Sequence, residues 1–315
     1  MLCQTTSVRF DAATDMPSFE GKVILVTGGN AGLGKQSVLD YARHNPRQIW
    51  LAARSLNKAQ TAIDKITTAI PQHNNTSTII KPLELDLASF VSIRKAAETF
   101  LAESDRLDIL MLNAGIMGTE PGLTEDGYEI QFGTNHMGHA LLTKLLLPAL
   151  TRTAAAPDSD VRVVCMSSYG HTQVPDGGFR FDTPRTLAED LGPYGRYYQS
   201  KLANVLFARH LAKVYPQLTV ASVHPGLVQT QLMDRASGTP TYVKVLTKIG
   251  YRLLKTPEDG AKNQLWASVS RDVKSGEYYE PVGVGGKASA NGTNDELARQ
   301  LWEWTEMELE GVKAW

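Results

Sequence analysis

The chain has 315 residues, 42% of them hydrophobic, and a formal net charge of −1 at pH 7. This length allows a large α/β domain, and the near-neutral charge with dispersed Lys and Arg excludes a basic surface for nucleic acid. Two cysteines, Cys3 and Cys165, are too few for a disulfide framework or a cysteine-rich zinc site, so we expect a reducing compartment and no metal.

Residues 1–20 are polar and mixed in character, without the apolar core of a signal peptide. No later stretch approaches the roughly 18–20 apolar residues of a membrane span. We therefore expect a cytoplasmic protein without a transmembrane segment.

Short β-rich runs then alternate with helical patterns. Strands are predicted at residues 22–27, 48–53, 78–83, 107–113, 161–167 and 218–224. Most are nearly continuous apolar runs, which is typical of strands buried on both faces. Helices are predicted at residues 33–43, 57–69, 91–102, 128–150 and 197–214. This alternation predicts parallel pairing through right-handed crossovers, and hence a doubly wound, three-layer α/β/α fold of the Rossmann type.

The last part of the chain has a different pattern. Residues 239–255 form a basic amphipathic stretch, a helix is predicted to begin at Pro257, and residues 276–281 are predicted as a seventh strand. An acidic helix is predicted at residues 294–309. Because no linker separates these elements from the core, we expect one domain over residues 1–315 with a mostly parallel, seven-stranded sheet.

A glycine-rich loop with the sequence TGGNAGLG, Thr27 to Gly34, directly follows the first strand and precedes the first helix. Glycines there permit a tight turn, let the backbone approach a phosphate closely, and place the anion at the helix N-terminus. We predict a phosphate-binding loop in which five residues contact the cofactor: Gly28, Asn30, Gly32, Leu33 and Gly34.

The same loop allows a second interpretation, because Gly29 to Lys35 matches the start of an NTPase P-loop, Gly-x-x-x-x-Gly-Lys. The next residue is Gln36 and not the Ser or Thr that would ligate magnesium. The fourth strand ends in Asn113, Ala114 and Gly115 and lacks a Walker-type aspartate. A dinucleotide is therefore favoured over ATP.

Residues after the second and third strands bear on the choice of dinucleotide. A carboxylate after the second strand would favour NAD(H), but this chain has Arg54 there and Lys58 one turn later. A cation can pair with a 2′-phosphate, which favours NADP(H), although Arg54 could also be a solvated side chain. Asp86, followed by Leu87, could accept a hydrogen bond from the adenine amino group or cap the next helix.

Tyr197 and Lys201 stand four residues apart in a predicted helix, so they share one face of it. A nearby ammonium favours the phenolate and should lower the pKa of the tyrosine from its ordinary value of about 10. The neighbouring Tyr194 and Tyr198 have no cation four residues on. Such a pair is also common on solvated helix faces, so it indicates proton transfer only together with other residues.

Together these residues resemble a short-chain dehydrogenase/reductase, over about residues 20–285. The family's glycine motif and its Asn-Ala-Gly motif match the glycine loop and Asn113, Ala114 and Gly115. The catalytic tetrad is matched by Asn135, Ser168, Tyr197 and Lys201. The Pro-Gly segment that lines the nicotinamide and phosphates is matched by Pro225, Gly226, Val228 and Thr230.

Within the family, the chain is most similar to the retinol-dehydrogenase-like and WW-domain-oxidoreductase-like branch. The similarity rests on Asn135-His136-x-Gly138-His139, on the run from Tyr197 to Asn204, and on His224-Pro225-Gly226. The interval from Ser168 to Tyr197 is long, as is usual in this branch. Its insertion, including residues 177–181, is expected to form part of the substrate wall.

The resemblance implies hydride transfer between a nicotinamide and a carbonyl or alcohol carbon of a small hydrophobic substrate, with reduction favoured by NADP(H). Tyr197 would exchange the proton, Lys201 would lower its pKa and hold the nicotinamide ribose, and Ser168 would hydrogen-bond the substrate oxygen. Asn135 would hold a water for a proton relay. His171 is a further candidate for contact with substrate, whereas His136 and His139 are expected to be packing residues.

Other aspects stay open at this point. Residues 231–256 are expected to form a substrate lid, as in the family. The helices at residues 128–150 and 197–214 are common dimer faces in the family, so a homodimer is possible and a monomer is not excluded. An alternative function is a cofactor-binding protein with a regulatory or partner-binding role and little turnover.

Overall fold

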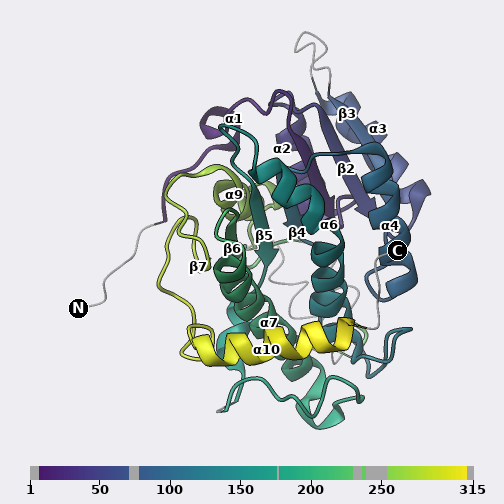
Figure 1. The fold of residues 1–315 in the computed structure, drawn as a ribbon, viewed down its shortest axis with the longest axis vertical. Coiled ribbons are helices and arrows are strands. Elements are labelled where there is room, and N and C mark those ends of the chain that lie inside the picture. The colour runs from purple at the N-terminus through teal and green to yellow at the C-terminus, as the bar shows by residue number, and fades with distance from the viewer. Residues whose placement is uncertain (1–6, 71–77, 176, 230–235, 239–253, 311–315) are drawn as a thin grey trace.

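The computed structural model describes residues 7–70, 78–175, 177–229, 236–238 and 254–310 (Figure 1). Its seven strands form one sheet in the order β3-β2-β1-β4-β5-β6-β7, and every pairing is parallel. The strands are β1 (Val23–Thr27), β2 (Gln48–Ala53), β3 (Ile79–Glu84), β4 (Ile109–Leu112), β5 (Arg162–Met166), β6 (Thr219–Val223) and β7 (Glu277–Tyr279). All seven predicted strands are confirmed, and the sheet is wholly parallel.

Helices cover both faces of this sheet. They are α1 (Ala12–Asp15), α2 (Gly32–Ala42), α3 (Leu56–Ala69), α4 (Phe90–Glu103), α5 (Ile130–Phe132), α6 (Gly138–Ala154), α7 (Gly192–Val214), α9 (Pro257–Val269) and α10 (Asp295–Leu309). The apolar faces of α2, α3 and α9 pack on one side of the sheet, and those of α4, α6 and α7 pack on the other. The expected three-layer α/β/α fold is therefore confirmed. No helix in the described ranges is both long and apolar enough to cross a membrane.

The order of the strands places the site. The chain moves outward from β1 to β3 and then returns to β4 on the other side of β1. In an open α/β sheet, ligands bind outside the carboxyl ends of the strands where the order reverses in this way. The loops that follow β1 and β4 meet at that point.

The helix predicted at residues 128–150 is interrupted. It consists of α5, a π-helical turn over Gly133–Met137, and α6. Periodicity does not reveal such a turn, because one extra residue in a turn leaves the apolar pattern on both sides intact. Close packing accompanies it, since a Cβ atom on Gly138 would overlap the Leu87 carbonyl oxygen. The short helix α1, whose N-cap is Asp11, was also not predicted.

Helix α10 lies across α7, as Figure 1 shows, and also contacts α6. Trp302 stacks on Phe207 of α7 with ring centroids 5.6 Å apart. Phe179 of the insertion is buried against Phe132, with centroids 5.2 Å apart. The expectation that residues 177–181 line the substrate is therefore wrong for Phe179. Its ring belongs to an aromatic cluster that also includes Trp304 of α10.

Candidate active site

The glycine loop forms a tight turn at the carboxyl end of β1. Gly28 and Gly32 have φ values of +68° and +52°, in the region that favours glycine. A Cβ atom on Gly34 would overlap the Gly28 carbonyl and lie 2.5 Å from Asn113 Nδ2. The loop is therefore shaped by its glycines in the way that close approach to a phosphate requires.

The start of α2 has free hydrogen-bonding capacity. Its N-cap, Ala31, has no side chain that can accept from the first amides of the helix. By contrast, α3, α4 and α9 are capped by the side chains of Ser55, Ser89 and Thr256. Uncapped amides at a helix N-terminus bind anions, so this end of α2 fits a dinucleotide phosphate.

Asn113 and Ala114 join the loops after β1 and β4. Their backbone amides each donate to Thr27 Oγ1 at 2.9 Å, and Asn113 Nδ2 donates to the Thr27 carbonyl at 2.8 Å. Gln264 of α9 in turn donates to Asn113 Oδ1 at 3.3 Å. These bonds hold the switch point of the sheet in one geometry, as expected for Asn113.

The residues expected around the adenosine lie after β2 and β3. Arg54 and Lys58 are exposed, and neither forms an ion pair within the described part of the chain. Asp86 Oδ1 accepts from Ala88 N at 3.0 Å, while the cap of α4 is Ser89. Asp86 is therefore not the helix cap, and its second oxygen has no bond to a described residue. The adjacent Leu87 is buried.

Asn135 lies in the π-helical turn and is fully buried. Its Oδ1 accepts from Ile116 N at 2.8 Å, and its Nδ2 donates to the Ile116 carbonyl and to Ser200 Oγ, each at 2.9 Å. A Cβ atom on Gly115 would lie 3.1 Å from Asn135 Oδ1 and 3.4 Å from Lys201 Nζ. Asn135 and Lys201 therefore converge on the backbone of Gly115.

The other three tetrad candidates also meet here. The Ser168 side chain lies close enough to the Tyr197 phenol to lower its pKa, and Lys201 Nζ lies 5.6 Å from the centre of the Tyr197 ring. Lys201 Nζ donates to the Met166 carbonyl at 3.1 Å. Tyr197 is buried, whereas Tyr194 and Tyr198 are partly exposed. The structure brings together the four side chains that the sequence suggested.

The net shift of the Tyr197 pKa is opposite to the expected lowering, because burial is its largest cause. Burial raises the pKa of Tyr197 to about 12, and the contact with Ser168 counteracts only part of that rise. Burial also lowers the pKa of Lys201, to about 8. Removal from water disfavours both charged forms, so the phenol stays protonated and the ammonium readily loses its proton.

His171 is close to Ser168 but is 1% exposed. Its Nδ1 bonds the Ser168 carbonyl at 2.7 Å, and its Nε2 accepts from Ser289 N at 3.1 Å. With both nitrogens bonded inside the protein, the ring is not placed to contact a substrate. His136 and His139 are likewise buried. His136 bonds the Thr305 hydroxyl, and His139 bonds the Asn135 carbonyl.

The Pro-Gly segment follows β6. Val228 pairs with Lys255 in an isolated parallel bridge, in which Lys255 bonds the backbone of Leu227 and Gln229. The amide and carbonyl of Val228 therefore point away from Lys255. Gly226 has a φ of +88°, and a Cβ atom there would lie 3.1 Å from Lys255 Nζ. Thr230 lies outside the described residues.

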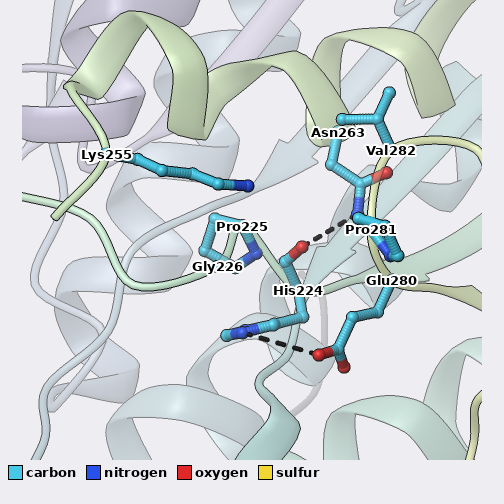
Figure 2. A pocket seen from close by; sticks show the side chains of 8 residues that line it. All are labelled: His224, Pro225, Gly226, Lys255, Asn263, Glu280, Pro281 and Val282. Carbon is cyan, nitrogen blue, oxygen red and sulfur yellow. Dashed lines mark hydrogen bonds and ion pairs between the residues drawn. The ribbon is translucent and has the colours of Figure 1, made fainter. Parts of the chain in front are cut away.

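A cavity of about 160 Å³ opens beside this segment (Figure 2). Lys255 extends into it from one side, and His224 and Glu280 line the opposite side. Asn263 Nδ2 donates to the His224 carbonyl at 2.8 Å. Burial is the main reason why the pKa of His224 falls to about 4, so its ring is neutral although Glu280 lies 3.9 Å away.

Several residues of the site were not predicted. Thr27 was noted only as part of the glycine motif, and Gln264, Lys255 and Glu280 were not considered as site residues. Lys255 and Glu280 come from segments that only the folded chain brings to the end of β6. One signal was available, because Lys255 lies within the expected lid and two residues before the predicted helix at Pro257, and so had to lie at the same edge of the sheet as the other loops.

Comparisons with known proteins agree with this geometry. The family model described as short chain dehydrogenase matches residues 22–177. A short-chain dehydrogenase/reductase of Aspergillus calidoustus is 37% identical over 309 residues, covering 93% of this chain and 95% of its own. Retinol dehydrogenase 13 of Homo sapiens is 36% identical over 298 residues, covering 92% and 85%. The predicted resemblance to the retinol-dehydrogenase-like branch is confirmed.

Solved structures share the fold. A crystal structure of an uncharacterized protein from Mycobacterium paratuberculosis has a TM-score of 0.71 at 27% identity, covering 97% of this chain and 98% of its own. A short chain dehydrogenase of Escherichia coli CFT073, complexed with NADPH, has a TM-score of 0.62 at 23% identity, covering 85% and 99%. At that identity the second similarity concerns the fold alone.

Proposed function

The chain belongs to the short-chain dehydrogenase/reductase family, and we propose that it is an NADP(H)-dependent enzyme that reduces a carbonyl group of a small hydrophobic substrate. The observation that carries this proposal is the convergence of Tyr197, Ser168, Lys201 and Asn135 beside the uncapped start of α2. Tyr197 and Lys201 can give or take a proton, and Ser168 and Asn135 can orient them.

The residues present fit a nicotinamide dinucleotide. The glycine loop and the start of α2 would hold the phosphates, and the amide and carbonyl of Val228, which point away from Lys255, would face the nicotinamide end. When bound, the cofactor supplies the hydride. The protein then has to orient the substrate carbonyl, exclude water, and deliver a proton to its oxygen.

Tyr197 is suited to deliver that proton. Because burial raises its pKa to about 12, the phenol is protonated at neutral pH and acts as an acid. Ser168, close to the same phenol, would bond the substrate oxygen as negative charge develops there. Lys201, with a pKa of about 8, can release a proton near neutral pH and so replenish the tyrosine. These protonation states support reduction as the working direction.

The preference for NADP(H) over NAD(H) is proposed from Arg54. This exposed guanidinium follows β2, at the place where a carboxylate would bind the ribose hydroxyls of NAD(H). A guanidinium can bind a 2′-phosphate with two parallel hydrogen bonds. Lys58, in the first turn of α3, would add positive charge, and Asp86 would bond the adenine.

A hydrophobic substrate is proposed from the side chains around Ser168. Tyr169, the next residue, is 54% exposed, and Leu227 of the Pro-Gly segment is 74% exposed. Most of the expected lid, residues 231–256, lies outside the described residues; within it, Ser237 and Gly238 bond the loop at Glu120 and Gly118. The low cysteine content is the basis for proposing a cytoplasmic location.

Consumption of NADPH with a panel of ketones and aldehydes tests this function. We expect turnover by the unmodified protein and a loss of about 10²-fold or more in Tyr197→Phe, with NADPH affinity retained. Wild-type turnover in Tyr197→Phe would refute the role of Tyr197. Tight NADPH binding without turnover on any compound would instead favour the regulatory, cofactor-binding alternative.

A further inference from the structure

His171 connects the catalytic-site serine to a distant part of the chain. It lies in a 3₁₀ turn over Tyr169–Gln173, directly after Ser168. A backbone carbonyl only accepts hydrogen bonds, so the 2.7 Å contact with Ser168 O requires a proton on His171 Nδ1. A backbone amide only donates, so the 3.1 Å contact with Ser289 N requires a bare Nε2. The ring is therefore neutral and in one tautomer.

The ring is also held by packing. It lies against the Tyr278 ring of β7 with centroids 4.5 Å apart. A Cβ atom on Gly292 would lie 3.4 Å from its Cδ2 atom. His171 is thus fixed from two later segments, β7 and the loop that contains Ser289 and Gly292.

The position of Ser168 depends on His171. The Ser168 carbonyl accepts from both the backbone amide and the ring of His171, at 3.1 and 2.7 Å. The Ser168 hydroxyl accepts from Gly170 N at 3.1 Å and lies close enough to the Tyr197 phenol to lower its pKa. With its carbonyl held by His171 and its hydroxyl held by Gly170 N, Ser168 has little freedom to turn its side chain away from Tyr197.

We propose that His171 is a positioning residue that holds the Ser168 hydroxyl against Tyr197 by fixing the Ser168 carbonyl to the segment around Ser289. This inference rests on the proposed function, and it replaces the expected contact between His171 and substrate. The loop around Ser289, more than a hundred residues away in sequence, thereby becomes part of the support of the active site.

The proposal has a readout that packing alone would not move. The contact with Ser168 lowers the pKa of Tyr197 against the rise caused by burial, so its loss moves the alkaline limb that reports ionisation of Tyr197 to higher pH, while the limb of Lys201 near pH 8 stays in place. The other titratable groups around this cluster are Tyr278 and Glu280 near β7, His224 after β6, and Lys201 of α7. Burial lowers the pKa of His224 most and His171 adds to that effect, while Tyr278 packs on the His171 ring, so these two groups also respond to a substitution at His171.

Two variants separate hydrogen bonding from packing. His171→Phe keeps a ring against Tyr278 and loses both hydrogen bonds. His171→Asn loses the ring but places an amide N–H where Nδ1 was, so the bond to the Ser168 carbonyl is kept. We expect His171→Phe to lower kcat by about tenfold or more at near-constant NADPH affinity, with its alkaline limb moved to higher pH. We expect His171→Asn, which keeps the bond to the Ser168 carbonyl and loses the link to Ser289, to lie between His171→Phe and the unmodified protein in both kcat and the limb.

A matched control is His44→Phe. His44 also bonds a backbone carbonyl, that of Ala12 at 2.8 Å, and packs on an aromatic ring, Phe19, but lies near the N-terminus and away from the site. His44→Phe should leave both kcat and the alkaline limb of the pH profile unchanged. The opposite ranking, with His171→Asn impaired and His171→Phe like wild type, would show a packing role and overturn the proposal.

Nitrogen NMR of the unmodified protein provides a test that needs neither a folded variant nor turnover. The proposal requires His171 to be neutral with its proton on Nδ1 at pH 7. A proton on Nε2, or a charged ring, would overturn it. If no carbonyl compound is turned over by the unmodified protein, the proposed function fails, and the tautomer still decides whether the Ser168–His171–Ser289 geometry exists.

Discussion

The two side chains proposed to handle the proton have pKa values that burial has shifted in opposite directions. In water, a tyrosine is the slightly stronger acid of the two. In this site the order is reversed, with Tyr197 at about 12 and Lys201 at about 8. Between about pH 8 and pH 12, both side chains are therefore uncharged. Below pH 8 a protonated phenol lies next to an ammonium that can return a proton to it, which agrees with the proposed reduction.

Lys201 should lower the stability of the protein. Its buried ammonium has one hydrogen bond, to the Met166 carbonyl, and its pKa lies well below the ordinary 10.5. We expect Lys201→Met to raise the free energy of unfolding by about 2 kcal/mol at pH 7, as a gain of roughly 3 from removing the buried charge less about 1 for the bond. Chemical denaturation measures this.

The pH dependence of this difference in stability shows whether the buried ammonium of Lys201 causes it. Between pH 8 and 10.5 the unfolded chain binds this proton and the folded chain does not, so the stability of the unmodified protein rises with pH there. The advantage of Lys201→Met is therefore complete below pH 8 and disappears as the pH approaches 10.5. The exposed Lys65→Met is the control, expected within about 0.5 kcal/mol of wild type at every pH. A constant advantage would contradict the explanation.

Arg54 determines cofactor preference in the proposed function. Arg54→Asp replaces a cation with a carboxylate that repels a 2′-phosphate and can bond the ribose hydroxyls. We expect the ratio of NADPH to NADH affinity to fall by about tenfold or more, measured by titration of protein fluorescence. The matched control is Arg47→Asp at the opposite end of β2, where an equal change in charge should leave the ratio unchanged.

At the level of elements, the strands were predictable because burial on two faces produces continuous apolar runs. The long helices were predictable because apolar residues recur every three or four positions along an amphipathic helix. The predicted strand at residues 48–53 matches β2 fully, and the helix at residues 57–69 differs from α3 by one residue. The π-helical turn that carries Asn135 was not predictable, because it changes hydrogen bonding and leaves the apolar pattern intact.

The site, too, was predictable only in part. Its tetrad was predictable from spacing and resemblance, since each residue lies at the end of a strand or on a helix beside it. The pKa of Tyr197 was not, because it depends on how deeply the ring is buried after folding. His171 was noticed for its position after Ser168, but its partners, Ser289 and Tyr278, lie far along the chain and no local pattern connects them.

Helix α10 should contribute substantially to stability. Leu301 is 1% exposed in the core that α10 shares with α7, whereas Met307 of the same helix is 59% exposed. We expect Leu301→Ala to lower the free energy of unfolding by about 2–4 kcal/mol through lost burial and a residual cavity. Met307→Ala should change it by less than about 0.5 kcal/mol. Both variants are measured by thermal and chemical denaturation. If Leu301→Ala and Met307→Ala changed the free energy of unfolding equally, α10 would not be docked as described.

At the level of the whole molecule, the described surfaces that could pair with a second copy are covered or interrupted. The edge strand β3 contains Lys81 and Pro82, which disfavour pairing with another sheet. The other edge strand, β7, has three residues. Helix α10 packs on α7 through the Trp302–Phe207 stack and is joined to α6 by the Lys144–Glu306 ion pair at 2.6 Å.

We therefore predict a monomer of 34.5 kDa in solution, because a dimer built on α6 and α7 would have to displace α10. Light scattering coupled to size-exclusion chromatography measures this mass directly, and twice that mass would contradict the prediction. A chain that ends before Asn294 supplies the converse test. Without α10, the apolar surface around Phe207 and Phe132 is exposed, and such a patch drives association. That shortened chain should self-associate where the full chain does not, which would show that α10 occupies the place of a second subunit.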